Sequence, residues 1–136
     1  MVDLNDWRTC CVVAYLDEPP YFMPVGGADP IGCDIELAKV VLADLGIASI
    51  EFVLTTFAEL IAGVRTHRWH INVPMFITPE RSQRIAYSLP VWAATDSFIV
   101  RSTDQRDFTS YESIAADDTI RLAAVTGQIQ LDTALA

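Results

Sequence analysis

Short apolar runs alternate with amphipathic stretches along the first half of the chain. Residues 10–16 (CCVVAYL) are too few for a helix and rich in β-branched side chains, so they predict a buried strand. Residues 19–32 hold repeated prolines and glycines and predict a loop without regular structure. In residues 34–45 the apolar positions recur at helical spacing, which predicts an amphipathic helix that stops at Gly46.

The alternation continues through residue 82. Residues 49–54 (SIEFVL) predict a second strand, and residues 56–59 (TFAE) match the capping box that starts a helix. Residues 71–77 (INVPMFI) predict a third strand, in which Pro74 indicates an edge, a bulge or an early end. Thr78 is a good N-cap for a short helix. Strands and helices in this order predict an α/β fold with parallel strands joined by crossovers.

The pattern is different in the last third of the chain. Residues 96–101 (DSFIVR) predict a strand, and a polar stretch follows it. Residues 111–116 predict a short helix, 120–125 a further strand, and 128–136 the start of another helix after Gly127.

Composition excludes several classes of protein. The 136 residues carry 9 basic and 18 acidic side chains, a net charge of −9, and 51% are hydrophobic. Nucleic-acid binding and attachment to anionic membranes both need clustered Lys and Arg, so neither is expected. Disorder is not expected at this apolar content, and the apolar runs are too short to span a membrane. The first residues, MVDLNDWRTCC, do not have the pattern of a secretory signal.

The sequence contains no clear motif for metal binding or redox chemistry. The cysteines, Cys10, Cys11 and Cys33, are odd in number and lack zinc-type spacing, and we expect buried free thiols. His67 and His70 have no acidic or cysteine partner at ligand spacing. No nucleophile elbow or phosphate-binding loop occurs. We therefore expect no metal, no cofactor and no catalytic activity.

Arg81 is the first candidate for binding. It lies in the first turn of the helix predicted after Thr78, at the carboxyl end of a parallel-type strand, where open α/β sheets place ligands. A guanidinium can hold a carboxylate through two parallel hydrogen bonds. The alternative is that Arg81 only pairs with Glu80 or Glu36 on the surface.

Tyr21 and Phe22 form a second candidate, on the proline-rich loop after the first strand. Aromatic rings on a stiff loop can stack over a small ligand. They can equally form a hydrophobic plug at the edge of the sheet.

Four segments in this order carry a family resemblance: EPPYF, IGCDIELAKVVLADLGI, EFVLTTFAELIAGV and ITPERSQRIAYSLPVW. Together they closely resemble the bacterial periplasmic solute-binding proteins that serve amino-acid-type ABC transporters, whose pattern includes T-x-E-R before F-S-x-P-Y. The resemblance extends from residue 9 to the C-terminus. Several ordered motifs at the right separations are far more specific than any one of them.

The resemblance implies a periplasmic-binding-protein-like fold: a three-layer α/β/α lobe with a mostly parallel sheet, followed by the start of a second lobe. It implies that Arg81 grips the α-carboxylate of the ligand, and that Tyr21 or Phe22 covers the ligand. Thr56 leads the helix whose loop borders the cleft. In the second lobe, Gly127 and Gln128 match the turn that adds backbone donors.

The same resemblance divides the chain into a first ligand-binding lobe (1–95), a crossover (96–110) and the beginning of a second lobe (111–136). Relatives need a complete second lobe, so we expect that this polypeptide is a fragment with at most half a binding site. A homodimer that exchanges the missing elements is one way to complete it.

Departures from the family pattern affect the ligand. Pro74 and Phe76 stand where relatives have Gly and Ser or Thr, and His70 stands for an Asp. Proline donates no backbone N–H and phenylalanine no hydroxyl, so two donors are lost. We therefore expect a carboxylate ligand with an apolar or aromatic body, rather than Arg, Lys or Gln. Cys33 replaces an aromatic residue, a loss of volume.

The leading hypothesis is an extracytoplasmic solute-binding protein, located in the periplasm or outside the cell, that passes an amino-acid-like ligand to the membrane subunits of an ABC transporter. One alternative is the ligand-sensing ectodomain of a membrane-bound signalling protein. Another is an enzyme similar to cyclohexadienyl or arogenate dehydratases, for which the apolar Phe76 environment would be suitable.

Overall fold

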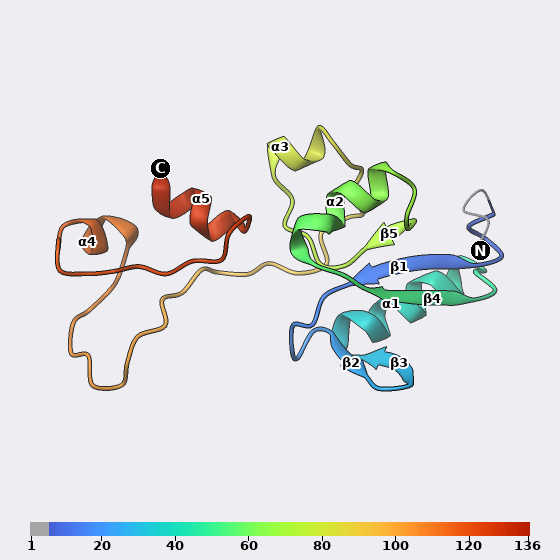
Figure 1. Ribbon diagram of the computed structural model, residues 1–136, viewed down its shortest axis with the longest axis horizontal. Helices are drawn as coiled ribbons and strands as arrows, with labels where there is room; N and C mark the ends of the chain where they lie inside the picture. Colours follow the sequence, from blue (N-terminus) through green and yellow to red (C-terminus); the bar gives the residue numbers. More distant parts are fainter. Residues whose placement is uncertain (1–5) are drawn as a thin grey trace. The chain divides into compact units, whose positions relative to one another are not determined.

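The computed structural model describes residues 6–136 and divides the chain into two units, Met1–Ser88 and Leu89–Ala136. The boundary lies seven residues before the end of the first lobe predicted from the sequence. The elements of the first unit are β1 (Cys11–Tyr15), β2 (Met23–Val25), β3 (Ala28–Ile31), α1 (Cys33–Asp44), β4 (Ile50–Leu54), α2 (Phe57–Arg65), β5 (Ile71–Asn72) and α3 (Pro79–Ser82) (Figure 1). The second unit contains α4 (Tyr111–Ala115) and α5 (Ile129–Leu135).

A parallel sheet of three strands, in the order β4-β1-β5, forms the centre of the first unit. β1 pairs with β4 along its whole length, from Cys11 opposite Ile50 to Tyr15 opposite Leu54. It pairs with β5 over two residues only. The expected parallel sheet is therefore confirmed, and β1 is buried because it has a neighbour on both sides.

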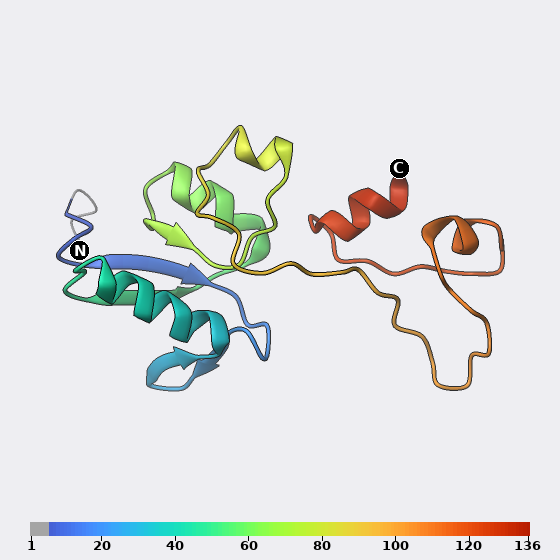
Figure 2. The same ribbon diagram turned by 180° about the vertical axis from the view of Figure 1, so that it is seen from behind.

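The side chains of β1 point alternately to the two faces of the sheet, and each face is covered by one helix (Figures 1 and 2). On one face Val12, Ala14 and Leu16 pack with Leu60 of α2 and with Trp69. On the other, Cys11 and Val13 pack with Leu42 of α1, and Tyr15 packs with Phe22 and Ile35. The helices thus complete the predicted three-layer α/β/α arrangement.

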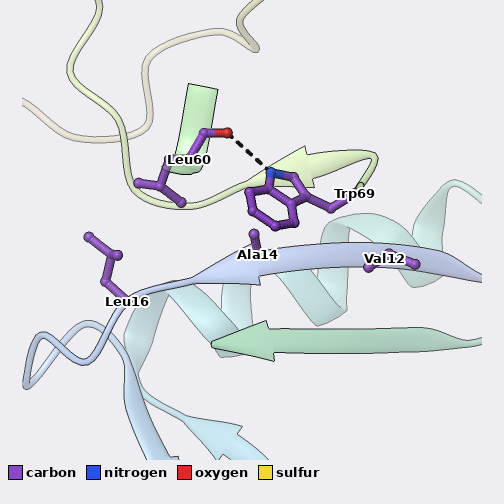
Figure 3. Packing of buried hydrophobic residues seen from close by; sticks show 5 residues of the cluster. All are labelled: Val12, Ala14, Leu16, Leu60 and Trp69. Atoms are coloured by element: carbon purple, nitrogen blue, oxygen red, sulfur yellow. Dashed lines mark hydrogen bonds between the residues drawn. The ribbon is translucent and has the colours of Figure 1, made fainter. Parts of the chain in front are cut away.

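Trp69 anchors the α2 face of the core. Its indole nitrogen donates a hydrogen bond of 3.1 Å to the carbonyl oxygen of Leu60, with the ring lying over Ala14 of β1 (Figure 3). The side-chain amide of Asn72 donates to the same carbonyl oxygen at 3.0 Å. Because a carbonyl oxygen has two lone pairs, Leu60 can accept both bonds, which join α2 to the segment before β5 and to the end of β5.

Two predictions for the first unit need correction, and a third is confirmed in part. Residues 19–32 are not irregular throughout, because β2 and β3 form an antiparallel hairpin that turns at Gly27 (φ 76°). The capping box of α2 does not form among the described residues, since Glu59 instead accepts a hydrogen bond of 3.0 Å from Thr55 Oγ1. The third strand lies at the edge of the sheet and ends at Asn72, so the edge position and the early end that Pro74 indicated are confirmed, and residues 73–77 are not part of the strand.

The second unit has the predicted helices without the predicted strands. α4 begins with a capping box in which Ser110 and Ser113 bond each other's backbone N–H groups, at 3.2 Å each. Residues 96–101 and 120–125 are not strands, although their apolar pattern predicted them. A strand exists only through pairing, and within the described part of the chain neither segment lies beside a partner. The side chain of Ile99 is fully exposed.

The three cysteines are free and have different environments. Cys11 is buried in β1, and Cys10 is half-buried. Cys33 is exposed at the first position of α1, so the expectation of buried thiols is wrong for this residue. Among the helices in residues 6–136, none has the length and apolarity needed to cross a membrane.

Candidate functional site

The candidate site lies at the carboxyl edge of the three-stranded sheet. Because the strands are parallel, Tyr15, Leu54 and Asn72 end β1, β4 and β5 at the same edge. The chain leaves this edge three times, toward Tyr21, toward Thr56 and toward Arg81. Residues far apart in the sequence are therefore brought to one side of the sheet.

Local sequence sets the position of Arg81. Thr78 caps α3, as predicted, by accepting a hydrogen bond of 3.1 Å from the backbone N–H of Arg81. Pro79 occupies the first helical position, where its missing N–H costs no helical hydrogen bond. Arg81 follows within this single turn.

The side chain of Arg81 is held from two directions. One guanidinium nitrogen, Nη1, donates to the carbonyl oxygen of Phe76 at 3.3 Å. The guanidinium carbon Cζ lies 5.4 Å from the ring centroid of Phe57, the first residue of α2. Arg81 is only 8% exposed. A buried guanidinium is a strong site for a carboxylate, because charge-assisted hydrogen bonds gain strength where water is excluded.

The alternative role of Arg81, a surface ion pair with Glu36 or Glu80, is weakened for Glu36. Glu36 lies on α1 and pairs with Lys39 at 3.1 Å, one turn along the same helix. Glu80 is exposed beside Arg81 in α3.

Tyr21 and Phe22 have opposite surroundings. Phe22 is 1% exposed and belongs to the core with Tyr15 and Ile35, so its ring is a packing element. Tyr21 is 47% exposed. Its backbone is fixed, because its N–H donates to Glu18 at 3.0 Å. Of the two aromatic candidates, only Tyr21 therefore has an accessible ring.

Gly32 holds the Tyr21 loop against the start of α1. Gly32 has φ 132°, a conformation that residues with a Cβ rarely adopt. A Cβ atom on Gly32 would collide with the carbonyl group of Tyr21. The backbone N–H of Asp34 donates to that carbonyl oxygen at 3.3 Å. Close approach of the two segments thus sets where Tyr21 lies.

The remaining predicted residues lie in both units. Thr56 is exposed at the N-cap of α2, and Phe76 is 48% exposed in the segment before α3. Gly127 (φ 84°) and Gln128 form the turn and the N-cap that precede α5 in the second unit. The structure brings Tyr21, Thr56, Phe76 and Arg81 to one unit, while Gly127 and Gln128 belong to the other.

Sequence reasoning missed two residues of the Arg81 environment. Phe57 was assigned to the helix face but lies against the guanidinium. Tyr87 donates its hydroxyl to the carbonyl oxygen of Phe76 at 3.2 Å, the same acceptor that Arg81 uses. No sequence spacing signals either contact, because each depends on how separate segments fold together.

His70 is bonded to β1 through both its side chain and its backbone. The Nδ1 atom of His70 accepts a hydrogen bond of 2.8 Å from the backbone N–H of Val12, and the backbone N–H of His70 donates to the Val12 carbonyl at 3.0 Å. His70 therefore fastens the segment before β5 to β1. Within residues 6–136 there is no group of three His, Cys, Asp or Glu side chains that could hold a metal ion.

Comparison with known proteins gives consistent matches. Residues 11–130 match the family model of the bacterial extracellular solute-binding proteins, family 3. A probable amino-acid ABC transporter periplasmic-binding protein from Sinorhizobium fredii is 33% identical over 131 residues, which are 94% of this chain and 44% of that protein. The chain therefore spans less than half the length of this relative.

Two solved structures share the fold. EhuB in complex with hydroxyectoine superposes on 98% of this chain and 53% of its own, with a TM-score of 0.83 and 23% identity. The arginine-bound form of domain 1 from TmArgBP has 30% identity and a TM-score of 0.54, over 66% of this chain and 72% of that domain. The latter is a single domain with its ligand bound.

Proposed function

The chain belongs to family 3 of the bacterial extracellular solute-binding proteins, and from this premise we propose that its first unit binds an amino-acid-like ligand through the carboxylate. The single observation that carries the proposal is the buried guanidinium of Arg81 at the carboxyl edge of the sheet. Its support by Phe57 and Phe76 holds the planar group in a fixed orientation. A preorganised guanidinium loses less entropy when it binds a carboxylate.

One lobe can provide the carboxylate half of such a site. The first unit has its own core on both faces of the sheet, and it contains Phe57 and Phe76, which contact the guanidinium of Arg81. The arginine-bound domain 1 of TmArgBP is a precedent for ligand binding by one domain. In the second unit, Gly127 and Gln128 of the turn before α5 are the residues proposed to contribute to ligand binding.

The body of the ligand is proposed to be apolar or aromatic. Pro74 and Phe76 remove a backbone donor and offer no hydroxyl in the segment between β5 and α3. The exposed rings of Tyr21 and Phe76 would enclose an apolar body at this edge. Arginine remains the instructive comparison ligand, because it is the ligand of a relative with 30% identity.

Transport is the proposed role of the whole protein. The Sinorhizobium fredii relative is named for an amino-acid ABC transporter and for the periplasm. We propose the same location, with the membrane subunits of such a transporter as the partner. Sensing by a signalling protein would use the same carboxylate site, and a dehydratase would convert its ligand, so the binding experiment includes a mass measurement of the ligand after incubation.

The test is calorimetry and thermal unfolding with L-phenylalanine, L-phenylalaninamide and L-arginine. Charge-assisted hydrogen bonds contribute about 1.5–3 kcal/mol each, so Arg81→Ala is expected to lower affinity for L-phenylalanine at least about tenfold. Arg84→Ala, which removes an exposed positive charge one turn later, is the matched control and should bind normally. L-Phenylalaninamide, without a carboxylate, should bind weakly to every form.

Three outcomes would contradict the proposal in different ways. Binding that is equal for the acid and the amide would exclude a carboxylate anchor. An equal loss of affinity for L-phenylalanine in Arg81→Ala and Arg84→Ala would indicate a diffuse charge effect. Preference for L-arginine over L-phenylalanine would leave the anchor intact and refute the apolar ligand body.

A further inference from the structure

The carbonyl oxygen of Phe76 accepts two hydrogen bonds from side chains of the same small region. Arg81 Nη1 donates at 3.3 Å and the Tyr87 hydroxyl at 3.2 Å. A carbonyl oxygen has two lone pairs, so both bonds can exist at once. Each distance is at the long end of the normal range, so neither bond alone fixes the group firmly.

The Phe76 carbonyl lies in the segment between β5 and α3, in which Val73 and Met75 pack against the core. β5 ends at Asn72, and the last backbone bond that joins this segment to β1 runs from the Val73 N–H to the Ala14 carbonyl, at 2.9 Å. Pro74 has no backbone N–H to contribute to the sheet. The segment is fixed again at Thr78, which caps α3. Phe76 lies between these two points, and its carbonyl oxygen is bonded by the side chains of Arg81 and Tyr87.

Tyr87 is suited to act as a permanent donor. Burial raises the pKa of its phenol, and the nearby positive charge of Arg81 offsets only part of that increase. The hydroxyl therefore keeps its proton at neutral pH and can donate. It does so from residue 87, beyond the end of α3, so the bond also joins the chain after the helix to the chain before it.

We propose that Tyr87 is a positioning residue for the carboxylate site: its hydroxyl fixes the carbonyl of Phe76, and that carbonyl fixes the guanidinium of Arg81. Without the hydroxyl, the carbonyl of Phe76 loses one of the two side chains that bond it, and its orientation toward Arg81 is less restricted. The part of the inference that concerns affinity rests on the proposed function. The part that concerns the orientation of Arg81 does not require a ligand.

The test compares Tyr87→Phe with Tyr111→Phe, which removes a hydroxyl from the second unit, where the Tyr111 ring packs against Phe98. The first readout is NMR of the ligand-free chain, using the carbonyl carbon of Phe76 and the Nε–H of Arg81, the latter assigned by its loss in Arg81→Lys. Tyr87→Phe is expected to shift both signals and to speed Nε–H exchange. Tyr111→Phe should change neither. Incorporation of 4-aminophenylalanine at position 87, which keeps a donor on the ring, should restore the wild-type signals.

The second readout is affinity for L-phenylalanine. Loss of one neutral hydrogen bond is expected to weaken binding about two- to tenfold in Tyr87→Phe, less than in Arg81→Ala. Unchanged NMR signals of Arg81 in Tyr87→Phe would overturn the inference, whatever the affinity. Normal affinity in Tyr87→Phe alongside lost binding in Arg81→Ala would also overturn it and leave the proposed function standing. If the wild type binds no probe, the proposed function fails and the NMR comparison still decides the role of Tyr87.

Discussion

The guanidinium of Arg81 lies over the aromatic ring of Phe57, with 5.4 Å between Cζ and the ring centroid. Phe57 starts the helix after β4, and Arg81 lies in the helix after β5, so the contact joins the turns that follow the two outer strands of the sheet. An aromatic face attracts a cation, by about 0.5–1 kcal/mol when exposed and by about 2 kcal/mol when water is excluded. The anion site therefore depends on the relative positions of α2 and α3.

Replacing the ring tests this dependence. Phe57→Leu keeps apolar volume against the core but removes the aromatic face, and we expect about two- to tenfold weaker binding of L-phenylalanine in calorimetry. Phe108→Leu is the matched control, because Arg106 lies 5.1 Å from the Phe108 ring centroid in the second unit. Equal affinity of the Phe57→Leu variant and the wild type would show that stacking does not orient Arg81.

The tight approach at Gly32 gives a second prediction. In Gly32→Ala the new Cβ collides with the Tyr21 carbonyl, and the backbone is strained at φ 132°. Strain of this kind costs about 1–3 kcal/mol, so the urea midpoint should fall and the Tyr21 ring signals should shift in NMR. Gly26→Ala is the control, since a Cβ at Gly26 has open space around it. A normal midpoint and unshifted Tyr21 signals in Gly32→Ala would refute this role.

The parts of the fold that sequence predicted well are those that local patterns specify. The run around Cys11–Tyr15 is apolar at every position because β1 is covered on both faces. Such a run can be recognised from the sequence of the strand itself, without knowledge of its neighbours. The Thr78 cap was also predictable, since it involves residues three positions apart. Arg81 follows from this cap, which explains why the principal site candidate could be placed before the structure.

Contacts between distant segments could not be predicted in this way. Phe22 and Tyr21 are adjacent and both aromatic, and Phe22 is buried because it packs with Tyr15 of β1 and Ile35 of α1, while Tyr21 stays exposed. The Tyr87 hydroxyl reaches a carbonyl eleven residues away. Residues 96–101 have a strand pattern, but pairing needs a second strand, and no property of the segment itself supplies one.

Gly63 gives a prediction about stability alone. It is buried in α2 against the ring of Trp69, and an added Cβ would overlap the ring. Although alanine favours helix formation by about 1 kcal/mol over glycine, overpacking a core typically costs about 1–3 kcal/mol, and the direct overlap should dominate. We expect Gly63→Ala to unfold at lower temperature and to disturb the bond from Trp69 to Leu60. Ala62→Gly, at an exposed position of the same helix, should lower stability only by helix propensity, with normal Trp69 fluorescence.

The buried thiol of Cys11 predicts how stability changes at alkaline pH. The pKa of Cys11 is raised from 9.0 to about 11, mainly because the thiol is buried and to a smaller extent because of the neighbouring Cys10. Below pH 9.0 the thiol is protonated whether the chain is folded or unfolded. Between pH 9.0 and about 11 the unfolded chain releases a proton that the folded chain retains, so the free energy of unfolding falls as pH rises. Burial also raises the pKa of Tyr15, which adds to the same trend at higher pH.

Two cysteine variants separate this effect from general alkaline damage. Urea unfolding at about pH 8 and about pH 10.5 should show a smaller loss of stability in Cys11→Ala than in the wild type, because the variant lacks the shifted thiol. Cys33→Ala should lose as much stability as the wild type, since Cys33 is exposed. In the native protein at about pH 8, a thiol reagent should modify Cys33 rapidly and Cys11 only after unfolding. Rapid modification of Cys11, or an equal loss of stability at alkaline pH in all three proteins, would mean that the Cys11 thiol in β1 is not shielded from water.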